Sequence, residues 1–195
     1  LMGLLLFPMK GVTLPDNYSQ VAANVLAQKY LRKAGIPKKL RAVKEKAVPS
    51  WLQKSVPDLK SMEDLPENEK FGEEIDGKQT FRRLAGTWTY WGWKHGYFAS
   101  EDDARSYFDE MSYMLASQMV SPNSPQWFNT GLNWAYGIEG PAQGHHFVNP
   151  KTGDLERSVN AYEHPQPHAC FIQSVSDDLV SEGGIMDLWT REARL

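Results

Sequence analysis

Apolar residues recur at helical spacing near the start of the chain. Within residues 19–34 they fall on one face of a helix, at positions 21, 22, 25, 26 and 30. Gly35 and Pro37 follow and supply a stop signal. The pattern therefore predicts one amphipathic helix.

A longer apolar stripe begins after Ser100. Ser100 and Asp103 have the spacing of a capping box, which opens helices. Apolar residues from Ala104 to Met119 then repeat every three or four positions, until Pro122 ends the pattern. This stripe therefore predicts a second amphipathic helix.

The segments around this stripe are less regular. Residues 38–77 mix charges and prolines around Trp51 and Leu52, which predicts an extended arm packed on a larger body. Residues 80–97 carry Trp88, Trp91 and Trp93 among interspersed glycines. Because aromatic side chains dominate core burial, this stripe favours packing over a ligand site.

The C-terminal third changes character. Residues 121–170 are rich in Pro, Gly, Asn and His, so they predict loops and short strands. Phe171 and Ile172 form a short β-prone run, and a helical pattern starts at Ser176 and Asp177. This order places a boundary between a helical layer and an α/β region.

Composition narrows the class of protein. The chain has 195 residues, 41% of them hydrophobic, which is ample for a folded core. A net charge of −3 offers no positive field for polymeric DNA or RNA. The apolar opening is far shorter than the roughly 20 residues that span a bilayer, so no membrane association is expected. A single cysteine, Cys170, excludes a disulfide within these residues and fits the reducing cytoplasm.

Cys170 is the first candidate for chemistry. It ends the run HPQPHAC, in which His164 and His168 precede it. A metal site is disfavoured, because zinc needs three or four ligands and no CxxC or HExxH motif accompanies this run. Cys170 could be a small buried hydrophobe or a reactive thiol whose thiolate His168 favours. The local pattern leaves both interpretations open.

Two further groups could bind a polar ligand. The run SPNSPQWFNTG contains Ser124 between two prolines, which suits either a grip on a sugar or phosphate or an ordinary turn. Asp177 and Asp178 are expected at a helix start, where they could be capping residues or could accept a bond from a ribose hydroxyl.

Several separated stretches match one family in order. The runs SQVAANVLAQKYLRKAGIP, VPSWLQKSVPD, MVSPNSPQWFNTGLNWAYGIEGPAQGHHF and HPQPHACFIQSVSDDLVSEGGIMDLWTREARL resemble the catalytic chain of adenosylcobalamin-dependent, class II ribonucleotide reductases. Residues 1–10 carry no such resemblance and stay unassigned.

The resemblance implies a fold and a division into domains. The family fold is a ten-stranded α/β barrel preceded by a mostly helical layer. Residues 11–165 would form the helical N-terminal domain, and residues 166–195 would begin the catalytic barrel with its first strand and helix. This chain would then be a fragment that lacks most catalytic residues.

The resemblance also implies a function, that of a ribonucleoside-diphosphate reductase type of enzyme, although the number of substrate phosphates stays open. Adenosylcobalamin would start thiyl radical chemistry and bind mainly outside this fragment. Cys170 would be one member of the reducing cysteine pair. Ser124, Ala169 and Cys170 would contact the substrate, and residues 177–179 (Asp177, Asp178 and Leu179) a deoxynucleotide effector.

The implied partners are a ribonucleotide, that effector, a thioredoxin- or glutaredoxin-like reductant and a second copy in a homodimer. Two alternatives remain: the large subunit of an iron-dependent ribonucleotide reductase, and a non-catalytic nucleotide-binding or interaction module.

Overall fold

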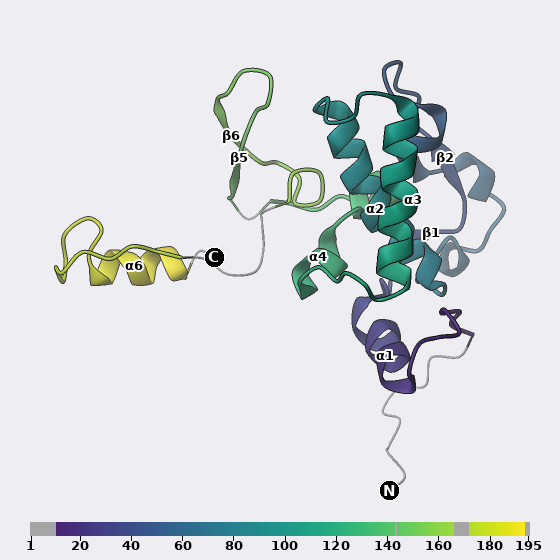
Figure 1. Ribbon diagram of the computed structural model, residues 1–195, viewed down its shortest axis with the longest axis horizontal. Coiled ribbons are helices and arrows are strands. Elements are labelled where there is room, and N and C mark those ends of the chain that lie inside the picture. The colour runs from purple at the N-terminus through teal and green to yellow at the C-terminus, as the bar shows by residue number, and fades with distance from the viewer. Residues whose placement is uncertain (1–10, 143, 166–171, 194–195) are drawn as a thin grey trace, which may run out of the picture.

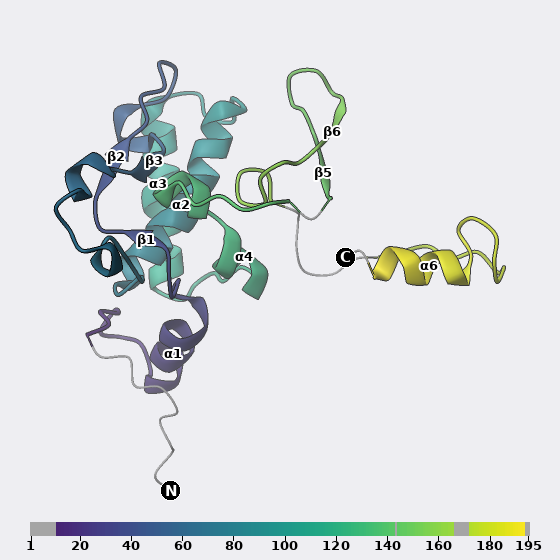
Figure 2. The same cartoon turned by 180° about the vertical axis from the view of Figure 1, so that it is seen from behind.

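A computed structural model describes residues 11–142, 144–165 and 172–193 of the chain. Figures 1 and 2 show a helical body, with a β-hairpin and a C-terminal helix extending to one side of it. The α-helices are α1 (Gln20–Val25), α2 (Gly77–Lys94), α3 (Glu101–Ala116), α4 (Ser124–Asn129), α5 (Leu132–Tyr136) and α6 (Ile185–Glu192). Short turns of other helix types are η1 (Leu26–Tyr30), η2 (Ser50–Leu52), η3 (Lys60–Met62) and η4 (Glu67–Glu69).

The strands are short and pair only two by two. They are β1 (Ile36–Pro37), β2 (Leu40–Ala42), β3 (Ser55–Pro57), β4 (Phe71–Gly72), β5 (His146–Val148) and β6 (Leu155–Arg157). The antiparallel pairs are β1 with β4, β2 with β3 and β5 with β6. Within the described residues the fold is thus mostly helical, and none of these sheets closes a barrel.

Helix α2 is the centre of the body. Asp76 begins it, since its carboxylate accepts from the Lys78 amide at 2.8 Å and the Gln79 side chain bonds back to the Asp76 amide at 3.0 Å. Gly86 faces Trp134 so closely that a Cβ would overlap the indole ring. Gly86 therefore lets the Trp134 ring approach α2. The predicted packing role of Trp88, Trp91 and Trp93 is confirmed, because each packs against a hydrophobic cluster.

Helix α3 packs beside α2 (Figure 1) and begins as predicted. Ser100 Oγ accepts from the Asp103 amide at 3.1 Å. The helix ends at Ala116, several residues before Pro122, because Gln118 takes a left-handed backbone with φ of 60°. Met119 lies beyond this end and is exposed, so its predicted place in the buried stripe is wrong.

The helix predicted over residues 19–34 is shorter and less regular. It ends at Tyr30, and its second half is the π-helical turn η1, in which the Leu31 amide donates to Leu26 O at 3.1 Å. Leu26 is buried, but Val21 and Val25 face solvent. Val21 and Val25 belong to α1, whereas Leu26 and Tyr30 of η1 pack on the hydrophobic core, so the predicted apolar face is formed only in part.

The prediction for residues 121–170 is partly wrong. The hairpin β5–β6 confirms short strands, but α4 and α5 are helices. Each is too short, at 6 and 5 residues, to show a helical period in sequence. Gly131, with φ of 84°, separates them and approaches α2 so closely that a Cβ would lie 2.7 Å from Thr87 Oγ1.

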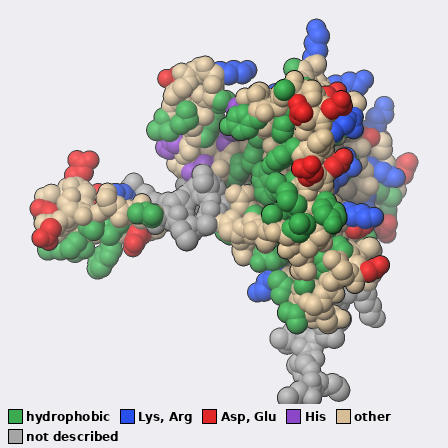
Figure 3. All heavy atoms as spheres, viewed as in Figure 1, with side chains coloured by type: hydrophobic (Ala, Val, Ile, Leu, Met, Phe, Trp, Pro, Cys, Tyr) green, Lys and Arg blue, Asp and Glu red, His purple; other side chains and the backbone are tan. Residues whose placement is uncertain are grey.

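The elements predicted after Cys170 also differ in part. Phe171 lies outside the described residues, and residues 172–193, which the structure describes, contain no strand. Helix α6 begins at Ile185, not at Ser176, because residues 176–184 form a turn. Figures 1 and 2 both show α6 standing apart from the helical body, and Figure 3 shows hydrophobic side chains along it.

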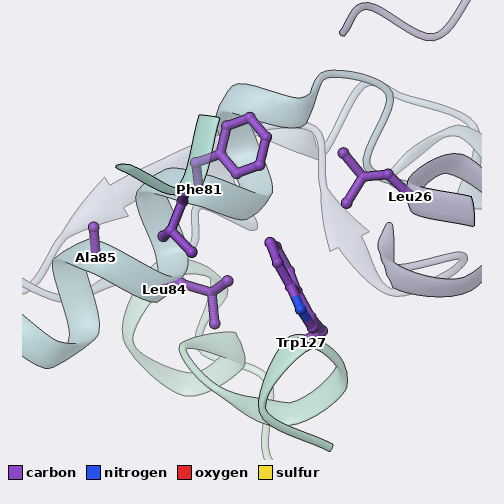
Figure 4. Close-up of a cluster of buried hydrophobic side chains, with 6 residues drawn as sticks. Leu26, Phe81, Leu84, Ala85 and Trp127 are labelled. Atoms are coloured by element: carbon purple, nitrogen blue, oxygen red, sulfur yellow. The ribbon is translucent and has the colours of Figure 1, made fainter. Parts of the chain in front are cut away.

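The largest hydrophobic cluster joins α2 to η1, α3 and α4. Its buried members are Leu26, Phe81, Leu84, Ala85, Leu115 and Trp127. Figure 4 shows Trp127 of α4 lying between Leu26 on one side and Leu84 on the other. This indole anchors α4 to the body.

Candidate functional site

Ser124 is the first residue of α4. The preceding Asn123 is extended, and Pro125 occupies the first turn of the helix, where a missing amide hydrogen costs nothing. The Ser124 side chain is exposed, and its Oγ lies 3.1 Å from the hydroxyl oxygen of Tyr30. Ser124 is therefore at a helix start rather than in a simple turn, with its hydroxyl at the surface.

Tyr30 comes from the end of η1, far from Ser124 in sequence. Its ring stacks on Trp127, with centroids 5.3 Å apart and planes inclined by 22°. Phe128 flanks the same ring at 5.6 Å. These two contacts fix the ring and thus the place where its hydroxyl meets Ser124.

A buried ion pair lies beneath this surface. Arg83 Nε donates to Glu74 Oε1 at 2.8 Å, and both side chains are 0% exposed. The Glu74 carboxylate also accepts from the Tyr136 hydroxyl at 2.8 Å, the Thr80 hydroxyl at 2.9 Å and the Arg32 amide at 2.8 Å. The carboxylate is well supplied with donors, as a buried charge must be.

This environment changes the titration of Tyr136. Burial raises the pKa of the Tyr136 phenol far above its ordinary value, and the negative charge of Glu74 raises it further. Tyr136 therefore stays a hydrogen-bond donor to Glu74 throughout the physiological pH range.

The other side of Arg83 faces backbone carbonyls. Nη1 donates to Thr130 O at 2.8 Å, and Nη2 donates to Trp127 O at 2.8 Å and to Tyr30 O at 3.3 Å. The first two oxygens belong to the end of α4, where carbonyls lack partners within the helix. The positive charge also suits the negative end of the helix dipole.

The predicted effector segment forms a turn ahead of α6. Asp178 Oδ1 accepts from the amides of Val180 at 2.9 Å and Ser181 at 2.6 Å, and these bonds, the one from Ser181 first, hold the pKa of Asp178 below its ordinary value. Asp177 and Leu179 are exposed. The predicted helix-start role is wrong for both aspartates, because Asp178 closes a turn seven residues before Ile185.

The structure does not bring all predicted site residues together. Ala169 and Cys170, with His168, lie outside the described residues. Ser124 belongs to the helical body, whereas the turn of residues 177–179 lies on the α6 arm, and Figures 1 and 2 show these two regions apart.

Sequence reasoning missed Tyr30, Glu74 and Arg83. A signal was present for Arg83, which follows Thr80 and precedes Thr87 at helical spacing on a face of α2 that carries no other charge. A charge in that position indicates a buried partner. The partner itself, Glu74, could not be identified before α2 had been placed.

Two larger cavities lie between α2 and the β5–β6 region. One, of about 650 Å³, is lined by Lys54, Tyr90 and Lys94 among others. The second, of about 780 Å³, is lined mainly by aromatic side chains, including Trp88 and Trp91. Within residues 11–142, 144–165 and 172–193, no group of three or more His, Cys, Asp or Glu side chains is arranged to hold a metal ion.

Comparison with known proteins gives the family. The model of the class II vitamin B12-dependent ribonucleotide reductase matches residues 2–118. The chain is 62% identical over 193 residues to the vitamin B12-dependent ribonucleotide reductase of Bradyrhizobium diazoefficiens and 63% identical to that of Agrobacterium fabrum. The protein of the same name from Rhodopirellula baltica is 30% identical. Each match covers 99% of this chain and 15% of the relative.

The chain therefore belongs to the class II, vitamin B12-dependent ribonucleotide reductase family. It spans about 15% of the length of these curated relatives. No helix among the described residues is both long and apolar enough to cross a membrane.

Neither of these two cavities is large enough to enclose the cobalamin that the family name implies. Cavities of 650 and 780 Å³ are the size that takes a drug-like ligand, and a corrin with its side chains is much larger. No step of the chemistry is therefore assigned to contacts between cobalamin and these residues.

Proposed function

We propose that this chain is the N-terminal part of an enzyme that reduces ribonucleotides to deoxyribonucleotides for DNA synthesis. The observation that carries the proposal is the family match over residues 2–118, together with relatives above 60% identity along 99% of the chain. The reaction would start from adenosylcobalamin, which supplies a radical and binds mainly outside this chain. Alone, the chain would be inactive.

In this proposal Cys170 supplies reducing equivalents. The ribose 2′-hydroxyl leaves as water, and Cys170 and a partner cysteine beyond this chain give up two electrons and two protons to form a disulfide. A thioredoxin- or glutaredoxin-like dithiol then restores both thiols by exchange. Such exchange requires an accessible thiolate, which a neighbouring His168 would favour.

Ser124 would contact the substrate with its hydroxyl, and Ala169 and Cys170 would line the same substrate. Two observations support the role of Ser124: its side chain is exposed, and its Oγ is held 3.1 Å from the Tyr30 hydroxyl. A hydroxyl can both donate and accept, so this pair offers a polar grip for a sugar or phosphate oxygen.

The turn of residues 177–179 would contact a deoxynucleotide effector. Within it, Asp178 Oδ1 accepts from the Val180 and Ser181 amides, and Asp177, Asp178 and Leu179 are all exposed. All three would therefore be free to contact the effector, and Asp178 would also fix the shape of the turn. The remaining parts of the proposal are a diphosphate substrate, a homodimer and a cytoplasmic location.

The test uses the full-length reductase that contains this chain. Ribonucleoside di- and triphosphates are supplied separately with a dithiol reductant, with and without adenosylcobalamin. We expect deoxynucleotide formation that depends on cobalamin, faster with the diphosphate. Activity that instead requires an iron-containing partner subunit would favour the alternative enzyme class, and nucleotide binding without turnover under all conditions would favour a non-catalytic module.

A further inference from the structure

Two chain segments meet at the exposed Ser124 hydroxyl, and one buried side chain contacts both. Tyr30 ends η1 and Ser124 begins α4, and their hydroxyl oxygens lie 3.1 Å apart. Arg83 Nη2 donates to the Tyr30 carbonyl at 3.3 Å and to the Trp127 carbonyl at 2.8 Å. A single nitrogen of Arg83 thus bonds to both segments that carry a hydroxyl, η1 with Tyr30 and α4 with Ser124.

The other two nitrogen atoms of the Arg83 guanidinium also donate hydrogen bonds. Nη1 donates to Thr130 O at 2.8 Å, and Nε donates to Glu74 Oε1 at 2.8 Å. Glu74 Oε2 in turn accepts from the Arg32 amide, two residues after Tyr30, at 2.8 Å. The ion pair therefore bonds to both sides of the η1 end as well as to the end of α4.

Only a guanidinium has the geometry to bond to the three carbonyl oxygens and to the Glu74 carboxylate at the same time. Its planar fork presents five N–H donors, whereas a lysine ammonium is a point charge on a flexible stem. In the place of Arg83 a lysine could keep the ion pair with Glu74. It could not bond to three carbonyl oxygens that belong to η1 and α4 at the same time.

We propose that Arg83 is the positioning residue that sets the distance between the Tyr30 and Ser124 hydroxyls and thereby the affinity for the ribonucleotide. This inference rests on the proposed substrate role of Ser124. Arg83 does not touch the substrate, because its side chain is wholly buried. It acts through the two backbone segments that it joins.

The test is a double-mutant cycle on ribonucleotide Kd in the full-length reductase, measured by equilibrium titration. Arg83→Lys should weaken binding about fivefold, the effect of one well-placed hydrogen bond, with unchanged stoichiometry. In the Ser124→Ala background the same change should alter Kd less than about twofold. Arg82→Lys is the matched control, because Arg82 precedes it on α2 and is exposed. A purely structural role would lower the stoichiometry instead and would do so in both backgrounds.

Each outcome is informative. Equal effects of Arg83→Lys in both backgrounds, or none in either, would overturn the inference. Ser124→Ala with unchanged Kd would overturn the substrate role of Ser124 and the inference with it, whereas a raised Kd for Ser124→Ala alone would leave that role standing. If Arg83→Lys fails to fold, Tyr30→Phe provides a second cycle, because it removes only the hydroxyl opposite Ser124 Oγ and leaves the buried ion pair intact; it should raise Kd, and should do so less in the Ser124→Ala background.

Discussion

The hydroxyl oxygens of Tyr30 and Ser124 lie 3.1 Å apart, although 94 positions separate the two residues in the chain. No local pattern creates this contact. It follows from the packing of η1 against α4 and from the buried pair Arg83 and Glu74 beneath them. The polar surface at Ser124 thus depends on charges in the interior.

Removing one member of that buried pair should destabilise the fold strongly. Glu74→Gln leaves the Arg83 charge without its counter-ion in the interior, and such a loss costs about 3–5 kcal/mol. Urea unfolding of the chain measures the free energy of unfolding for each variant. The control is Glu67→Gln, which removes an exposed pair with Lys70 and should cost less than about 1 kcal/mol. Equal, small losses in both variants would contradict the stabilising role of the buried pair.

Gly86→Ala should destabilise the chain even though alanine favours helices. The gain in helix propensity is about 1 kcal/mol, but the new Cβ would overlap the ring of Trp134. That ring is also fixed by its bond from Nε1 to Leu52 O at 3.0 Å, so it must shift at a cost of about 1–3 kcal/mol beyond the gain. The measurement is the Tm of Gly86→Ala in thermal unfolding, and the control is Ser106→Ala at an exposed position of α3. A rise in Tm for both variants would refute the close approach.

Alkaline pH should destabilise the chain through Tyr136. Its pKa is raised in the folded state by burial, so the neutral form stabilises the fold below the ordinary value of 10.0. As pH rises above that value the unfolded chain loses the phenol proton first, and stability falls by up to about 1.4 kcal/mol per pH unit. Urea unfolding between about pH 8 and 11 should show a shallower decline for Tyr136→Phe than for the exposed control Tyr113→Phe. Identical declines would show that Tyr136 does not contribute.

Asp178→Ala should loosen the turn ahead of α6. The amides of Val180 and Ser181 lose their acceptor, so their hydrogen exchange should accelerate about fivefold. Asp177→Ala is the control, because the Asp177 side chain makes no hydrogen bond within the described part of the chain. NMR exchange rates measure both variants.

Acid should have the same effect as that substitution. The pKa of Asp178 lies below its ordinary value of 3.8 because it accepts from the Ser181 and Val180 amides. The bonds are therefore fully present above pH 3.8 and are lost as pH falls through the lowered pKa. If the protection of the Val180 and Ser181 amides, measured relative to the exchange of an unstructured chain at the same pH, stayed constant across this window, the bonded turn would be contradicted.

The sequence predicted the parts of the fold that local rules govern. Ser100 and the stripe after it define α3, because capping and helical period both act within a few residues. The end of α3 at Ala116 was missed, since it depends on the left-handed backbone of Gln118. Helices α4 and α5 were missed because tertiary contacts, such as Trp127 in the main cluster, stabilise segments too short to form alone.

The candidate site was predictable only in part. Ser124 stood out through its prolines and through the family resemblance, and the structure places its hydroxyl at the surface. The contribution of Arg83 depends on three carbonyl oxygens from two distant segments, and sequence spacing carries no such information. The roles of Ala169, Cys170 and residues 177–179 stay predictions from the resemblance.

The proposed role of Cys170 is that of a redox thiol in a cobalamin-dependent ribonucleotide reductase. The most direct measurement is deoxynucleotide formation by full-length enzyme carrying Cys170→Ser, with adenosylcobalamin, a ribonucleotide and excess dithiol, alongside ribonucleotide Kd. We expect multiple turnover to be abolished while Kd stays within about twofold of the unaltered enzyme, since serine keeps the shape of the side chain but cannot form a disulfide. Unchanged turnover would contradict it.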